Sequence, residues 1–147
     1  MIIFLSACAY GQPLATSFQN ATESKGISID SLDKVYKSAL HADTAQAAFN
    51  GREQEFIKGY TSLLKDLAGF LKANNFMWEK TIRCFNRIYL NKNGKIDYFL
   101  FHFMEGEITP AKQARFEKLL GSFIENYQFP LTSTVHFAQC SPVKYSD

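Results

Sequence analysis

The chain has 147 residues, with 16 Lys and Arg against 14 Asp and Glu and a formal net charge of +2. This length predicts one domain with a buried core. The balanced charge is spread along the sequence and argues against a nucleic-acid-binding protein, which needs a basic stripe. No apolar stretch approaches the length of a membrane-spanning helix.

Residues 1–11 resemble the remaining end of a secretory signal peptide. An apolar run over residues 2–5 is followed by small residues, although the basic start of such a signal is missing. Two processing routes stay open: cleavage before Gln12, or lipidation of Cys8, which ends a lipobox-like sequence. A cytosolic protein with a core strand over residues 2–10 is the third interpretation. Export predicts a periplasmic, outer-membrane-associated or secreted protein, with a lipid anchor only in the Cys8 route.

Residues 12–30 are rich in Ser, Thr, Ala, Asn and Gln, which predicts a flexible leader ahead of a single domain over residues 31–147. A short helix is expected at the start of that domain, because apolar residues recur there at helical spacing behind Asp30 or Ser31 as N-cap. These apolar residues are Leu32, Val35, Tyr36, Ala39 and Leu40.

Residues 51–74 give the clearest helical pattern. Glutamates in the first turn and Lys72 in the last suit the helix dipole. One stripe holds Phe56, Ile57, Tyr60, Leu63, Leu64, Leu67, Phe70 and Leu71, and a domain of this size needs such a stripe as a core face.

A β-hairpin is predicted over residues 82–103, where two β-rich runs flank the turn Asn93-Gly94. A second helix is expected to begin at Pro110 behind Thr109 as N-cap, and a third strand over residues 133–140. The predicted fold is therefore α+β: a small three-stranded antiparallel sheet (a ββαβ core) preceded by a long amphipathic helix.

Tests for catalytic and metal sites give negative results. A calcium loop around Gly94 would place Tyr89 and Leu100 at positions that require carboxylates. The three histidines, His41, His102 and His136, lie in separate segments without paired motif spacing. Neither a nucleophile elbow nor a phosphate-binding glycine loop is present. The sequence thus predicts no catalytic residue, no metal and no cofactor.

Cys84 and Cys140 are the two cysteines of the predicted domain. If the last strand lies antiparallel beside the first hairpin strand, the start of one strand faces the end of the other. A disulfide between the two cysteines would then be natural in an oxidising compartment. Two buried free thiols are the alternative.

The hairpin over residues 88–96, the amphipathic helix through residues 116–120, and Phe129-Pro130 before the strand at Val135 resemble the TonB C-terminal domain. The resemblance covers about residues 80–143. An N-terminus at Gln12 also resembles exported proteins of Bacteroidota. The resemblance implies the family's fold and binding of a partner by strand addition. The chain departs from the family pattern at Thr109-Pro110, where many members carry an acidic helix start.

Two functions from different classes remain. The first is a non-enzymatic exported domain that binds an envelope protein, or a second copy of itself, through a sheet face or an edge strand. The candidate face has Phe99, Phe101 and Phe103 on one side of the second hairpin strand, with Phe85 and Tyr89 beside them. The alternative is a small periplasmic enzyme or ligand carrier with a pocket between helix and sheet. Such a pocket would be lined by Tyr60, Tyr98, His102 and His136.

Overall fold

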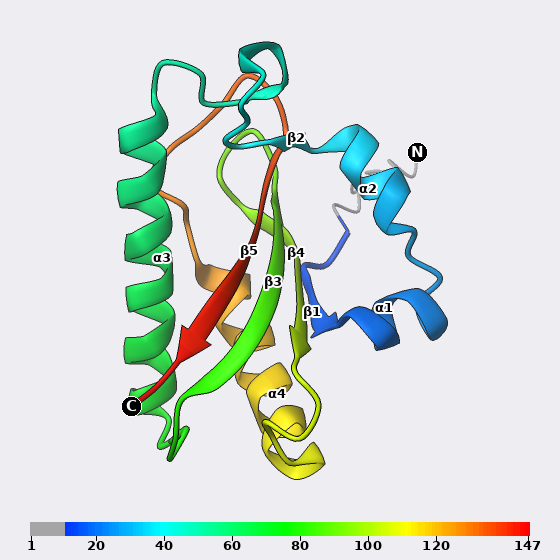
Figure 1. The fold of residues 1–147 in the computed structure, drawn as a ribbon, viewed down its shortest axis with the longest axis vertical. Helices are drawn as coiled ribbons and strands as arrows, with labels where there is room; N and C mark the ends of the chain where they lie inside the picture. The colour runs from blue at the N-terminus through cyan, green and yellow to red at the C-terminus, as the bar shows by residue number, and fades with distance from the viewer. Residues whose placement is uncertain (1–10) are drawn as a thin grey trace, which may run out of the picture.

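The structure is a computed structural model that describes residues 11–147, and within them it forms one mixed five-stranded sheet with helices on both faces (Figure 1). The strand order is β1-β4-β3-β5-β2. In chain order the elements are β1 Leu14–Ser17, α1 Phe18–Glu23, α2 Ile29–Val35, β2 Lys37–Ser38, the 3₁₀ turn η1 Thr44–Gln46, α3 Glu53–Ala73, β3 Ile82–Leu90, β4 Ile96–Phe103, α4 Pro110–Asn126 and β5 Phe137–Tyr145.

The expected fold, a three-stranded antiparallel sheet behind a long helix, is wrong. β3 does pair antiparallel with β4 and β5, but β1 lies parallel to β4 and β2 lies parallel to β5 at the two ends of the sheet. Two short helices, α1 and α2, precede the long helix α3. β1 and β2 are only four and two residues long. Such short strands lack a readable period, and each pairs with a strand far away in the sequence.

The segment 12–30, expected to be a flexible leader, contains β1 and α1. Ser17 ends the strand and caps the helix, because its hydroxyl accepts a hydrogen bond from the Asn20 N–H at 3.1 Å. Ala21 is fully buried and Phe18 packs beside it against the sheet. A few apolar residues in a polar segment are therefore enough to attach it to the domain.

The hairpin and the two long helices are confirmed. Gly94 has φ +83°, and an added Cβ would lie 2.8 Å from the Leu131 carbonyl oxygen, so the turn requires glycine. Thr109 caps α4 through the Lys112 N–H. The third strand begins later than expected and continues through Pro142, which is tolerated because this part of β5 lies at the edge of the sheet.

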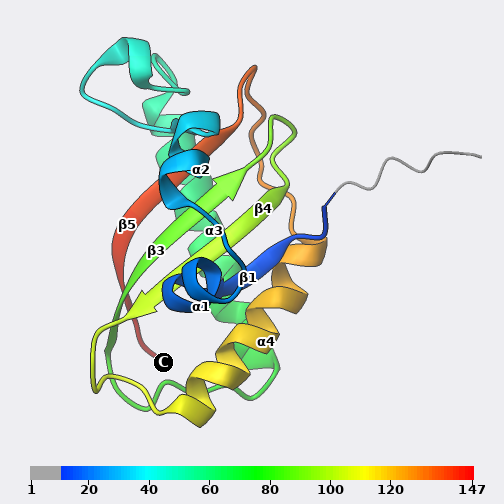
Figure 2. The same cartoon turned by 90° about the vertical axis from the view of Figure 1, so that its right-hand side faces the viewer.

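The two faces of the sheet are packed differently (Figure 2). α3 and α4 cover what we call the large-core face, and α1 and α2 lie against what we call the second face. The large core includes Phe56, Leu63, Leu67, Ile88, Phe99, Phe101, Phe116 and Leu120. The second core has Ala21, Tyr89, Leu100 and Ala138 fully or nearly buried.

Candidate functional site

The aromatic row of β4 does not form a free surface. Phe99, Phe101 and Phe103 are 0, 0 and 7 % exposed and lie on the large-core face. The Phe101 and Phe116 rings meet edge to face with centroids 5.1 Å apart, so α4 covers this row. The structure thus contradicts a binding surface made of these three side chains.

Phe85 and Tyr89, expected beside that row, lie on the opposite face. In the β3–β4 register Phe85 is paired with His102 and Tyr89 with Tyr98. The cause is a β-bulge: Leu90 is paired with Ile96 and Tyr89 with Tyr98, so Asp97 has no partner on β3. A register shift of one residue moves every later side chain to the other face.

The predicted disulfide is absent, since Cys84 and Cys140 are both free thiols. Cys84 is paired with Val143 on β5, whereas Cys140 is paired with Arg87. Cys84 is buried in the large core, and Cys140 is exposed on the second face, where the Arg87 guanidinium donates to its sulfur at 3.7 Å. The sheet itself separates the two thiols. The lipidation candidate Cys8 lies outside the described residues.

Among the residues that the structure describes, no strand covers the edge of the sheet along most of β5. β2 pairs only with Phe137 and Ala138, and residues 139–144 beyond this contact are all half-buried or exposed. The Lys37 and Ala39 N–H groups bond to the carbonyls of residues 136 and 138, so even-numbered residues of β5 direct their backbone toward this edge. In the part of β5 that extends beyond β2, the backbone groups that point away from β3 therefore belong to Cys140, Pro142 and Lys144. The opposite edge differs, because α4 packs along β1.

A polar network holds α2 to the second face. The Tyr89 hydroxyl donates to Asp33 Oδ1 at 2.9 Å, and Arg87 forms an ion pair with the same carboxylate at 3.3 Å. Burial raises the pKa of Tyr89, so the hydroxyl remains a donor at neutral pH. The network joins α2 to β3 across this face.

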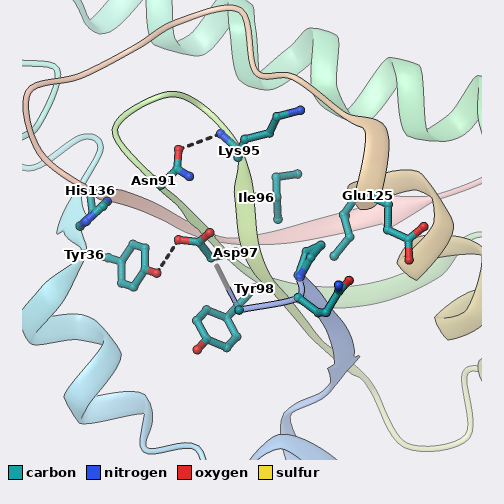
Figure 3. Close-up of a pocket in the computed structure, with 12 residues that line it drawn as sticks. Tyr36, Asn91, Lys95, Ile96, Asp97, Tyr98, Glu125 and His136 are labelled. Atoms are coloured by element: carbon teal, nitrogen blue, oxygen red, sulfur yellow. Dashed lines mark hydrogen bonds between the residues drawn. The ribbon is translucent and has the colours of Figure 1, made fainter. Parts of the chain in front are cut away.

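A pocket of about 660 Å³ opens at the turn end of the sheet (Figure 3). It lies between the segment before β1, the end of α2, the β3–β4 turn, the last turn of α4 and the residue before β5. This volume is in the range of small-ligand sites. Its lining residues are Gly11, Gln12, Pro13, Tyr36, Asn91, Lys95, Ile96, Asp97, Tyr98, Ile124, Glu125 and His136.

Tyr36 and Asp97 form the polar centre of the pocket. The Tyr36 hydroxyl donates to Asp97 Oδ2 at 2.6 Å. Burial, and then the bond to Asp97, raise the pKa of Tyr36, which keeps its proton on the phenol. Among residues 11–147 the Asp97 carboxylate forms no ion pair and no other hydrogen bond. One carboxylate oxygen is therefore free to accept a bond from a ligand.

His136 stands beside this pair, with its ring centroid 5.5 Å from that of Tyr36. Its Nδ1 accepts the Lys92 N–H at 3.2 Å, which places the ring proton on Nε2. The Lys92 backbone amide therefore occupies the Nδ1 side of the ring.

The pocket includes two of the four residues expected for a ligand site, Tyr98 and His136. The other two lie elsewhere: Tyr60 bonds to Ser141 from α3, and His102 stacks on Phe18. Tyr36 and Asp97 were not expected from the sequence as site residues. The only sequence signal for Asp97 was a carboxylate inside an apolar strand. A residue on the exposed side of a strand gives the same pattern.

Across residues 11–147, His, Cys, Asp and Glu side chains form no group of three or more that could hold a metal ion. In the same part of the chain no helix has both the length and the apolar character needed to cross a membrane. Comparison of the chain with protein-family profiles, curated proteins and solved structures finds no match in any of the three.

Proposed function

We propose that this protein is a non-enzymatic binding domain that receives an extended segment of a partner protein along the open edge of β5. The observation that carries the proposal is that, within residues 11–147, no strand pairs with the outward backbone groups of Cys140, Pro142 and Lys144. Strand addition at such an edge supplies main-chain hydrogen bonds, while neighbouring side chains select the partner. The TonB C-terminal-like resemblance points to the same mode of binding.

The edge limits which segments can pair with it. Cys140 and Lys144 each offer a backbone N–H and a carbonyl, whereas Pro142 offers only a carbonyl. Pro and Lys at an edge suppress indiscriminate pairing. Lys144 is the cross-strand neighbour of Arg83, whose charge is paired with Glu107 at 2.6 Å, and within residues 11–147 Lys144 itself forms no ion pair, so it is the uncompensated cation at this end of the edge. A partner segment with an acidic residue opposite Lys144 fits this charge.

The export route belongs to the same proposal. It rests on residues 2–12, and residues 1–10 lie outside the described part of the chain. A partner in the cell envelope follows from that route, and an envelope extract is therefore the source in which to search for one.

The test blocks one backbone donor at the edge. Cys140→Pro removes an N–H that points away from β3, so the sheet retains its β3–β5 hydrogen bonds, and Cys140→Ala is the matched control that keeps the N–H. Each protein carries a photocrosslinking residue at position 146, directly after β5, so that Lys144 is kept, and is exposed to envelope extract. We expect a crosslinked partner with the parent protein and Cys140→Ala, and its loss with Cys140→Pro.

Amide hydrogen exchange on the complex gives a second, local measurement. The N–H groups of Cys140 and Lys144 should exchange fast in the free protein and become protected when the partner binds. Equal crosslinking by Cys140→Pro and Cys140→Ala, or a complex that leaves both amides unprotected, would contradict strand addition.

A further inference from the structure

The pocket at the turn end of the sheet has an anionic and aromatic wall that the strand-addition proposal does not use. The β-bulge leaves Asp97 without a partner on β3, and this residue lies on the pocket wall between Ile96 and Tyr98. Bulges often redirect a side chain toward a functional site. Here the redirected group is a carboxylate with one oxygen uncommitted.

The cation nearest in sequence does not neutralise this carboxylate. Lys95 also lines the pocket, but its side chain points away from Asp97 (Figure 3). It forms no ion pair with Asp97. Glu125, on α4, lies on the opposite side of the pocket from Asp97. The pocket therefore presents negative charge that a positively charged ligand can balance.

Three aromatic rings line the pocket together with this carboxylate. The Tyr36 and Tyr98 rings stand nearly perpendicular, at 87° with centroids 6.4 Å apart, and His136 lies on the other side of Tyr36. The face of a tyrosine ring attracts cations, and a carboxylate beside it adds a charge-assisted hydrogen bond to any N–H of the ligand. Ile96 and Ile124 close the pocket from below as buried core residues, and the half-buried Pro13 supplies apolar surface next to the polar centre.

We propose that the pocket binds an alkylammonium group, whose charge lies on Asp97 beside the rings of Tyr36 and Tyr98. The carbon chain attached to that group lies against Pro13 and the half-buried ring of Tyr98. The Tyr36 hydroxyl fixes the carboxylate by bonding to Oδ2, which leaves Oδ1 for the ligand. A free small amine and a lysine side chain of another protein share this chemistry.

The test measures binding of defined probes to the full 147-residue chain by calorimetry and by NMR shifts of the pocket residues. Hexylammonium is compared with 1-hexanol, its neutral analogue of similar shape. We expect hexylammonium to bind at least about tenfold tighter, because only the cation gains the interaction with Asp97 and the rings. Raising the ionic strength about tenfold should weaken hexylammonium binding and leave 1-hexanol binding unchanged.

Variants locate the interaction. Asp97→Asn keeps an acceptor for the Tyr36 hydroxyl but removes the charge, and should weaken hexylammonium binding about tenfold. Tyr98→Leu should weaken it about fivefold by removing a ring face. Glu105→Gln removes an exposed carboxylate outside the pocket and is the control, with unchanged affinity expected. Circular dichroism shows that each variant is folded.

Two further probes separate the sources of the cation. Tighter binding of 1,5-diaminopentane indicates a free amine, and tighter binding of Nα-acetyllysine amide indicates a protein-borne lysine. Equal affinities for hexylammonium and 1-hexanol, unchanged binding by folded Asp97→Asn, or no binding of any cationic probe at millimolar concentration would overturn the proposal. The wild-type salt dependence decides the matter if Asp97→Asn does not fold. None of these results affects the β5-edge proposal, which is tested at another surface.

Discussion

The large-core face and the second face of one sheet are stabilised in different ways. On the large-core face, aromatic and aliphatic side chains of β3 and β4 are sealed under two long helices, with Phe101 and Phe116 in edge-to-face contact. On the second face, α1 and α2 are short and cover only part of the sheet. There Tyr89 is fixed to Asp33 by a hydrogen bond, and His102 and Cys140 are exposed.

This difference indicates which face can bind a partner or ligand without disturbing the core that stabilises the fold. Burial of apolar area on the large-core face supplies most of the stability, and a change there is expected to unfold the domain. The second face is held by fewer apolar contacts and more polar ones. The pocket lies where the second face meets the β3–β4 turn. The exposed side chains of β5 also lie on the second face.

The largest expected effect is on the large-core face. Phe101→Ala should lower the free energy of unfolding by about 3–5 kcal/mol, because a fully buried ring is lost and leaves a cavity. Phe85→Ala, on the second face, should cost only about 1–2 kcal/mol, since its ring is half-buried. Chemical denaturation of both variants beside wild type measures the contrast. Equal losses in the free energy of unfolding would show that the two faces contribute similarly to stability.

A smaller effect is expected from the polar network of the second face. Asp33→Ala should cost about 1–2 kcal/mol, because the buried Tyr89 hydroxyl loses its carboxylate acceptor. In a Tyr89→Phe background the same change should cost about 0.5 kcal/mol, since no donor is left unsatisfied. A double-mutant cycle from denaturation data gives the difference. Additive losses would mean that the hydrogen bond contributes little to holding α2.

The two thiols allow the faces to be compared by chemical reactivity, with little effect on stability at neutral pH. Cys140 is exposed, whereas Cys84 is buried, and burial raises the pKa of the Cys84 thiol to about 12. Iodoacetamide followed by peptide mapping should label Cys140 in the native protein and Cys84 only after unfolding. Labelling of both at one rate, or a Cys84–Cys140 bridge in the map, would contradict the face assignment.

The same pKa has a consequence at alkaline pH. The folded state holds the Cys84 proton up to about pH 12, while the unfolded chain releases it near pH 8.5. The contribution of Cys84 to stability is therefore complete below about pH 8.5 and decreases as the pH rises toward 12. Cys84→Ala should show a shallower decrease over this interval.

The hairpin, α3 and α4 were predictable because their signals are local. Asn93-Gly94 specifies a chain reversal, Thr109-Pro110 specifies a helix start, and an apolar stripe marks each long helix. β1 and β2 were not predictable, since a strand of two to four residues has no period and its partner is distant in the sequence. The end of β5 was misjudged because Pro142 suggested that the strand stops before it, and only the pairing of the strands shows that Pro142 lies at an edge.

What the sequence by itself determined is the set of local elements and the apolar residues available for a core. The tertiary structure decided which face each side chain occupies. One unpaired residue, Asp97, changes the register between β3 and β4, and this sends Phe85 and Tyr89 to the second face, away from Phe101. The same bulge places the Asp97 carboxylate against Tyr36, a residue 61 positions earlier. A bulge depends on the pairing of two strands and on what packs over them, so the pattern of either strand alone does not reveal it.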